Sequence, residues 1–267
     1  MPTEGRIARS ISKSRGSRGV SLLPFLPAGY PSIETTIACV RALDQIEGVG
    51  AIEIGFPFSD PIADGPVIQQ AFVHALEQGV KTRDIFDAFR PVALGLRVPL
   101  VTMVSYSIIF KYGSERFVMD ARQAGFSGIL VPDLPPPEAK GFCGRVTDAG
   151  LETVLLVAPT TTPARRAEIA RLCTGFVYYL SVSGITGERA ALPADLTANV
   201  TQIKSMTSVP VCVGFGISKP EHVRQLEGVG DGAIVGSAIV RVMQSVTNPS
   251  PTRLADEVAS ACRRLLV

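Results

Sequence analysis

The sequence predicts a single α/β domain, a closed (β/α)8 (TIM) barrel with an extra N-terminal helix, because three observations agree. Eight short apolar runs are each bounded by glycine, proline or aspartate. Amphipathic segments of ten or more residues separate them, which is typical of βαβ units in a parallel sheet. The length of 267 residues suits one barrel, which needs about 250 residues. A doubly wound open sheet is the alternative, and no composition break divides residues 1–267.

The eight runs are almost continuously apolar, as expected of strands that are covered on both faces. In chain order they are SLLPFLPAG (21–29), AIEIG (51–55), VPLVTMVS (98–105), GILVPD (128–133), ETVLLVAP (152–159), FVYYLSVSG (176–184), VPVCVGFG (209–216) and GAIVGSAIV (232–240). In such a barrel the chemistry lies at the carboxyl ends of the strands. Functional residues are therefore expected directly after each run.

Composition narrows the classes of function. A net charge of +2 with 46% hydrophobic residues indicates a folded globular protein and gives no reason to expect nucleic-acid binding. No apolar run approaches the roughly 18 residues of a membrane span. The basic segment 1–20 leads into no signal-peptide core, so a cytoplasmic protein is expected. Five widely spaced cysteines predict reduced, mostly buried thiols, and the distant His74 and His222 favour neither a zinc site nor a Ser-His-Asp triad.

Glu53 is the first candidate for proton transfer. Side chains alternate along a strand, so Ile52 and Ile54 share the face toward the helices, while Ala51 and Glu53 share the face toward the barrel interior. A carboxylate in such a low-dielectric cavity should have a raised pKa, which suits proton transfer near neutral pH. The alternative is a buried structural glutamate that a hydroxyl or backbone amide satisfies.

Two aspartates follow in the loop 55–68. Asp60 precedes Pro61, and Asp64 begins the turn toward the next helix. Turn formation alone explains either residue, and Asp60 is also a candidate for contact with a partner. Three carboxylates could bind Mg²⁺, but the spacing of a calcium loop is absent and no other ligand pattern supports a metal, so none is predicted.

Glycine motifs after the seventh and eighth runs predict a phosphate site. In VGFGIS (213–218) and VGSAIV (235–240), glycine lets backbone N–H groups approach an anion, and the second motif opens a helix whose dipole favours negative charge. Gly216, Gly236 and Ser237 are the expected donors. The long segment 181–195 after the sixth run is a candidate lid.

Five motifs carry a resemblance to a known family. EIGFPFSDPIADGP (53–66), GILVPDLPPPE (128–138), YYLSVSGITG (178–187), VCVGFGIS (211–218) and GAIVGSAIV (232–240), in this order, resemble the tryptophan synthase alpha subunit. The resemblance implies the retro-aldol cleavage of indole-3-glycerol phosphate to indole and D-glyceraldehyde 3-phosphate. It also implies a beta-subunit partner in an alpha2beta2 heterotetramer, with pyridoxal phosphate only in that partner and no cofactor in this chain.

The same resemblance implies roles for individual residues. Glu53 matches the general acid/base, and Asp64 matches the second catalytic carboxylate. The matched substrate-binding positions are Tyr178, Phe25, Asp133, Thr186, Gly187, Gly216, Gly236 and Ser237. Pro57, Phe58 and Asp60 are the expected partner contacts, with Asp60 proposed because its exposed turn adjoins Phe58. In this scheme an acid protonates C3 of indole, Asp64 accepts the indole N–H, and Glu53 serves first as acid and then as base.

The chain also departs from the family pattern in places. Ser105 and Ser107 stand where many members carry tyrosine and asparagine, and Pro27 and Tyr30 replace a common threonine and aspartate. Three alternatives stay open: a stand-alone indole-3-glycerol-phosphate lyase, a weakly active barrel kept as an allosteric partner, and another phosphate-binding barrel such as a phosphoribosyl isomerase or indole-glycerol phosphate synthase. The aspartate loop argues against the last, as does the lack of lysine between residues 48 and 79.

Overall fold

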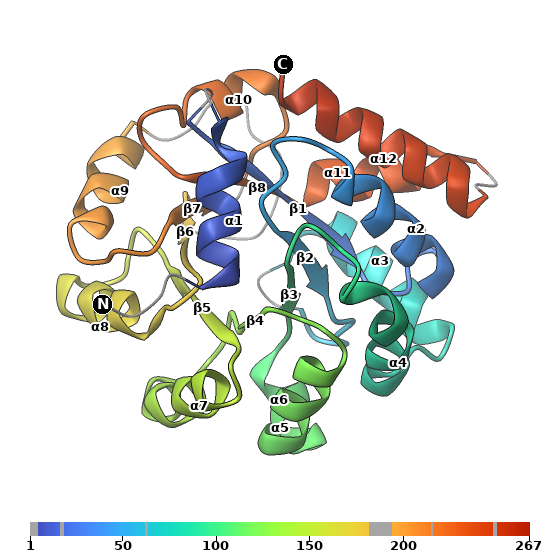
Figure 1. Cartoon of the computed structure of the whole chain (residues 1–267), viewed down its shortest axis with the longest axis horizontal. Coiled ribbons are helices and arrows are strands. Elements are labelled where there is room, and N and C mark those ends of the chain that lie inside the picture. The colour runs from blue at the N-terminus through green and yellow to red at the C-terminus, as the bar shows by residue number, and fades with distance from the viewer. Residues whose placement is uncertain (1–4, 17–18, 62–63, 182–193, 215, 248–249) are drawn as a thin grey trace.

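Eight parallel strands close into a barrel in which each strand pairs with its neighbours in chain order (Figure 1). The computed structural model describes residues 5–16, 19–61, 64–181, 194–214, 216–247 and 250–267. The strands are β1 (Ser21–Pro27), β2 (Ile52–Gly55), β3 (Leu100–Met103), β4 (Gly128–Leu130), β5 (Glu152–Val157), β6 (Phe176–Leu180), β7 (Val211–Gly214) and β8 (Gly232–Val235). Each predicted run contains one strand, so the barrel prediction is confirmed and the open sheet is excluded.

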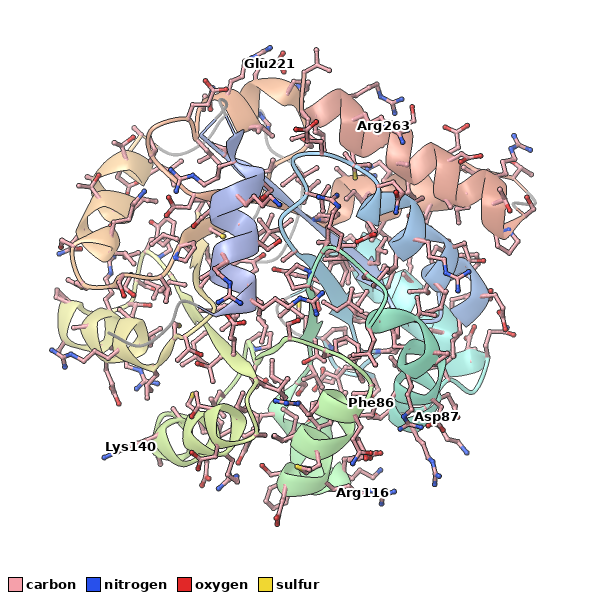
Figure 2. All side chains as sticks on the ribbon, in the orientation of Figure 1. Phe86, Asp87, Arg116, Lys140, Glu221 and Arg263 are labelled. Carbon is pink, nitrogen blue, oxygen red and sulfur yellow. The ribbon has the colours of Figure 1, made fainter. Side chains whose placement is uncertain are left out.

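Helices form a ring around the strands (Figure 1). They are α1 (Arg6–Ser14), α2 (Ile33–Asp44), α3 (Pro66–Glu77), α4 (Thr82–Ala93), α5 (Tyr106–Tyr112), α6 (Ser114–Gln123), α7 (Pro136–Asp148), α8 (Pro163–Leu172), α9 (Leu196–Lys204), α10 (Pro220–Arg224), α11 (Ser237–Ser245) and α12 (Pro251–Leu265). Proline opens five of them, α3, α7, α8, α10 and α12, where its missing N–H costs no helical bond. Charged side chains such as Asp87, Arg116 and Lys140 lie on the outside of this ring (Figure 2).

The alternation of side chains along each strand separates two apolar layers. Ile52 and Ile54 of β2 belong to the large core between the barrel and the helices. Ala51, Val101 and Tyr178 belong to the smaller core inside the barrel. Glu53 lies between Ile52 and Ile54 in the strand and is fully buried, so its side chain faces the barrel interior, as its position in the strand predicts.

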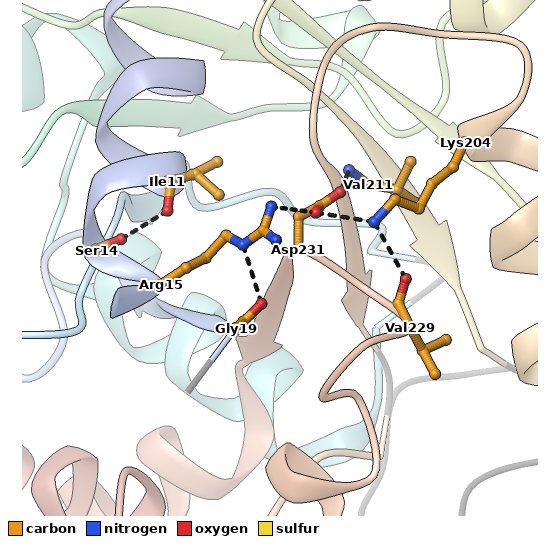
Figure 3. Close-up of polar contacts among 8 residues, drawn as sticks. All are labelled: Ile11, Ser14, Arg15, Gly19, Lys204, Val211, Val229 and Asp231. Atoms are coloured by element: carbon orange, nitrogen blue, oxygen red, sulfur yellow. Dashed lines mark hydrogen bonds and ion pairs between the residues drawn. The ribbon is translucent and has the colours of Figure 1, made fainter. Parts of the chain in front are cut away.

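The extra helix α1 closes the end of the barrel where the strands begin (Figure 1). Ile7 and Ile11 of α1 pack into the inner core. A Glu152 carboxylate oxygen accepts a hydrogen bond from the Ile7 N–H at 2.9 Å. At the other end of α1, the Asp231 carboxylate binds Arg15 and Lys204 (Figure 3). Because this end of the barrel is plugged, a ligand reaches the interior from the carboxyl ends of the strands.

Two further predictions concern the whole chain. All five cysteines are buried and unpaired, as predicted. No helix in the described part of the chain is long and apolar enough to span a membrane.

Candidate active site

Glu53 is a fully buried carboxylate whose two oxygens have no hydrogen-bond partner among the described residues. Burial raises its pKa from 4.5 to about 8, because the charged form loses hydration and gains nothing in return. The sequence was also compatible with a structural glutamate whose carboxylate is hydrogen-bonded to a hydroxyl or backbone amide. The structure does not show such hydrogen bonds for Glu53 among the described residues. A carboxyl group of this kind keeps its proton near neutral pH and can donate it.

Asp64 lies at the end of the loop after β2, directly before the first turn of α3. Its backbone N–H donates to the Pro61 carbonyl at 3.0 Å, and its own carbonyl accepts from the Gln69 side chain at 2.7 Å. These bonds fix the backbone and leave the carboxylate for other contacts. The side chain is buried, and burial raises its pKa from 3.8 to about 6.

A cavity of about 520 Å³ opens at the carboxyl ends of the strands, and Asp64 lines it, whereas the fully buried Glu53 is not among the described lining residues. Its lining includes Asp64 and Tyr178, which share it with a mostly apolar wall: Phe72, Met103, Val104, Leu130, Leu156 and Leu180. Such a wall suits the burial of a flat apolar ring, with a few polar groups to orient it. The rim carries the further residues Phe58, Asp60, Pro61, Ser105, Ser107, Pro132 and Asp133.

Tyr178 lies close enough to both predicted catalytic carboxylates, Glu53 and Asp64, for their charges to affect its pKa. Burial raises its pKa well above the ordinary value, and the charges of Glu53 and Asp64 raise it further. A Cβ atom at Gly214, on the adjacent strand β7, would lie 2.3 Å from the Tyr178 hydroxyl. Only glycine therefore lets the tyrosine take this place.

Phe25 pairs in register with Glu53 across β1 and β2. Its ring meets the edge of Phe72 with a centroid distance of 6.4 Å. A Cβ atom at Gly55 would lie 2.4 Å from the Phe25 ring. Phe25 is not among the described residues that line the cavity, although its neighbour Phe72 is, so its predicted substrate contact stays a prediction.

Asp133 lies on the cavity rim, but its carboxylate already binds the protein. The Ser105 hydroxyl donates to one oxygen at 2.7 Å, and the Tyr106 N–H donates to the other at 2.8 Å. Both donors lie at the start of α5. This helix, within residues 104–113, was not predicted from the sequence. In this state Asp133 orders the rim by holding α5 in place, and its predicted substrate contact stays a prediction.

The predicted phosphate donors lie after β7 and β8. Gly216 has a φ of 93°, a left-handed conformation that favours glycine. Gly236 directly precedes α11, and Ser237 is the first residue of that helix. A Cβ atom built on Gly236 would lie 3.7 Å from Phe25, so this helix start borders the same end of the barrel. Two other predicted contacts lie outside the described residues, namely Thr186 and Gly187, with most of the segment 181–195.

The predicted partner contacts differ in accessibility. Pro57 is buried, Phe58 is half-buried and Asp60 is exposed. Phe110 on α5 was not predicted as a surface residue, and its side chain is 75% exposed. The sequence alone does not show this exposure.

The apolar wall of the cavity was also not predicted from the sequence. Strand alternation could have found three of its members, because Met103, Leu156 and Leu180 each lie two residues after an inward-facing residue. Phe72 comes from α3 and gave no such signal. Within the described residues, no group of three or more His, Cys, Asp or Glu side chains is placed to hold a metal ion.

Fold and site together define a class, a (β/α)8 barrel with two buried carboxyl groups, Glu53 and Asp64, whose pKa values burial raises. A family model described as "Tryptophan synthase alpha chain" matches residues 11–265. The chain is 46% identical over 250 residues to the tryptophan synthase alpha chain of Rhodopirellula baltica, with 92% of this chain and 90% of that one covered. It is 38% identical over 266 residues to that of Gloeobacter violaceus, with 99% and 95% covered. A mutant tryptophan synthase alpha-subunit from Pyrococcus furiosus superposes with a TM-score of 0.84 at 37% identity, over 93% of this chain and 98% of that one. The chain belongs to the tryptophan synthase alpha chain family.

Proposed function

We propose that this chain cleaves indole-3-glycerol phosphate into indole and D-glyceraldehyde 3-phosphate, as a carbon–carbon lyase in tryptophan biosynthesis. One observation carries the mechanism: Glu53 is fully buried, its carboxylate has no hydrogen-bond partner among the described residues, and its pKa is raised to about 8. A group with this pKa can give up a proton and take one back near neutral pH. The apolar wall of the adjacent cavity suits the indole ring.

The reaction needs two proton movements that Glu53 can perform in turn. It first donates its proton to C3 of the indole, which makes the ring a cationic leaving group. It then accepts the proton of the side-chain hydroxyl next to C3 while the C–C bond breaks. The bond electrons return to the ring to form neutral indole, and the alcohol carbon becomes the aldehyde of glyceraldehyde 3-phosphate.

Asp64 stabilises the cationic ring in this scheme. With a pKa of about 6, its carboxylate is ionised above that pH while Glu53 is still protonated. It can then accept the indole N–H as positive charge develops. The higher pKa of Glu53 supports the proposal that Glu53 is the acid and Asp64 the anion.

The test is indole release from indole-3-glycerol phosphate by the wild type, Glu53→Gln and Asp64→Asn, each with and without a beta subunit. Asp87→Asn, on the outer surface of α4, is the control. Slow release by the wild type, stimulation by the partner and a loss of at least 100-fold in both site variants are expected. Fast release without stimulation would favour the stand-alone lyase. No release under any condition would refute the reaction and leave the allosteric barrel.

We infer that the partner is a tryptophan synthase beta subunit in an alpha2beta2 assembly, and that pyridoxal phosphate belongs to that subunit alone. The half-buried Phe58 and the exposed Asp60 line the cavity at the open end of the barrel, and Phe110 is exposed on α5, whose residue Ser107 lines the same cavity. In this proposal these three side chains form the contact surface. Asp60→Ala and Phe110→Ser should each weaken binding to the beta subunit, as measured by calorimetry. Unchanged affinity in both would place the interface elsewhere. The unpaired cysteines support a reducing compartment, and we propose the cytoplasm.

A further inference from the structure

Gln69 on α3 is a half-buried glutamine whose side chain binds the loop that carries Asp64. Its Nε2 atom donates to the Asp64 carbonyl at 2.7 Å and to the Pro61 carbonyl at 3.4 Å. Asp64 and Pro61 both line the cavity of the proposed active site. Each link from Gln69 to the cavity is therefore one direct hydrogen bond between described residues.

The two acceptors determine how the Gln69 amide is oriented. A glutamine side chain has a nitrogen that donates two hydrogen bonds and an oxygen that only accepts. Both contacts are with carbonyl oxygens, so the nitrogen faces the loop. Neither an apolar side chain nor an ionised carboxylate at this position could form these bonds.

The contact does not serve as a cap for α3. The first turn of a helix leaves backbone N–H groups that need acceptors, and capping side chains supply an oxygen for them. Gln69 supplies a donor instead, and both of its acceptors precede the N-cap residue Gly65. The helix therefore gains no partner for its free N–H groups, whereas the loop has its carbonyls bound.

The backbone on both sides of Asp64 is held by short-range hydrogen bonds. The backbone N–H of Gln69 donates to the Gly65 carbonyl at 3.0 Å, so Gln69 binds two successive carbonyls. The Asp64 N–H donates to the Pro61 carbonyl at 3.0 Å. Together these bonds fix the direction in which the Asp64 side chain leaves the backbone.

The helix that carries Gln69 is itself firmly held, as a positioning group requires. Its neighbours Ile68 and Phe72 belong to a buried apolar cluster. The Gln244 side chain of α11 donates to the Val67 carbonyl at 3.1 Å in the first turn of α3. Gln69 thus reaches the loop from a fixed base.

We propose that Gln69 is a positioning residue that holds Asp64 in the orientation in which its carboxylate accepts the indole N–H. The inference rests on the proposed function, because it concerns the same carboxylate. Stabilisation of charge in a transition state depends on groups that are already in place, and a misplacement of about 1 Å can cost about 100-fold in rate. Releasing the loop should therefore lower kcat more than it weakens substrate binding.

The experiment compares Gln69→Met and Gln69→Glu with Gln70→Met. Methionine and glutamate keep the length of the side chain, but neither methionine nor an ionised glutamate can donate to a carbonyl. Gln70 is the next residue on α3 and is exposed, so it is a matched control. With indole-3-glycerol phosphate we expect kcat to fall about 5-fold or more in both Gln69 variants, with KM within about 3-fold of the wild type. Gln70→Met should keep the wild-type values.

Combination with Asp64→Ala shows whether Gln69 acts through Asp64. This variant has no carboxylate to orient, so adding Gln69→Met should change kcat/KM by less than about 2-fold. A purely structural role would lower the concentration of folded enzyme by the same factor with and without Asp64→Ala. An equal loss in both backgrounds, or a wild-type kcat in the Gln69 variants, would overturn the proposal.

Hydrogen exchange separates this inference from the proposed reaction, because it needs no turnover. Exchange of the Asp64 backbone N–H, followed by NMR on the whole chain, should be about 10-fold or more faster in Gln69→Met than in the wild type and Gln70→Met. Amides of β2 should keep their rates, which excludes global unfolding as the cause. Faster exchange at Asp64 alone would support the positioning role even if the wild type releases no indole. Equal rates at Asp64 would refute it while leaving the reaction intact.

Discussion

Replacing Glu53 by glutamine should change how the stability of the barrel depends on pH. The folded protein holds the Glu53 proton with a pKa of about 8, whereas the unfolded chain has an ordinary value of 4.5. Between these values the folded state binds one more proton than the unfolded state. The wild type therefore loses stability as pH rises, by about 1.4 kcal/mol per pH unit. Glutamine carries no titrating proton, so this loss disappears in the variant.

The size of the effect follows from the two pKa values. Full ionisation of Glu53 corresponds to about 5 kcal/mol, and about 2.5 kcal/mol of this lies between about pH 5.5 and about pH 7.5. The raised pKa of Asp64 also makes stability fall with pH, but it does so in both proteins and cancels in the difference. Tyr178 and Cys212 have pKa values well above their ordinary range and stay neutral over this interval.

The assay is urea unfolding at a series of pH values, followed by far-ultraviolet circular dichroism because the chain has no tryptophan. The difference in free energy of unfolding between Glu53→Gln and the wild type should shift by about 2.5 kcal/mol in favour of the variant from about pH 5.5 to about pH 7.5. The glutamine side chain places a buried amide at this position. Its effect on the free energy of unfolding does not depend on pH, so it shifts the variant's stability by the same amount at every pH. Parallel stability curves for the two proteins would show that Glu53 is ionised in the folded state and would refute the reasoning.

Three further substitutions test separate parts of the structure. Gly214→Ala should push against the Tyr178 hydroxyl, cost about 1–3 kcal/mol of stability and slow indole release; wild-type kinetics would contradict the contact. Gly144→Ala lies inside α7, where the new methyl group meets no atom within 4 Å, so urea unfolding should show a gain of about 0.5–1 kcal/mol, and a loss would contradict this. Asp231→Asn removes the ion pairs with Arg15 and Lys204 at the closed end of the barrel. It should lower stability by about 1–3 kcal/mol and leave the KM unchanged, whereas a changed KM would show that the two ends of the barrel are coupled.

Local periodicity was sufficient to place Glu53. The alternation within AIEIG depends only on adjacent residues, and the covered barrel keeps its register because a slip of one residue would turn the glutamate into the outer core. The same reasoning held for the eight strands, since each run is short, apolar and bounded by residues that end strands. In these cases the decisive information lies within about ten residues of chain.

Contacts between distant loops could not be predicted in this way. Asp133 holds Ser105 across 28 residues, and Arg166 reaches Asn199 across 33 residues. Both contacts depend on how far neighbouring strands are staggered and on where each loop turns, and neither quantity is encoded in one segment. Asp133 therefore suggested a pocket residue, and Arg166 suggested no more than one charge on an amphipathic helix.

Two buried glutamates at opposite ends of the same barrel show why Glu53 is suited to chemistry. Glu152 is also buried, and burial raises its pKa, but backbone N–H groups at the start of α1 donate to its carboxylate and oppose the shift. Those bonds stabilise the anion and secure the helix. Glu53 has no such donors among the described residues, so nothing stabilises its charge and its pKa remains high. Adding a donor beside Glu53 would make the fold more stable above neutral pH, and it would also remove the acid that the proposed protonation of C3 requires. The unsatisfied state of Glu53 is therefore expected of the proposed reaction, whereas a structural glutamate would resemble Glu152.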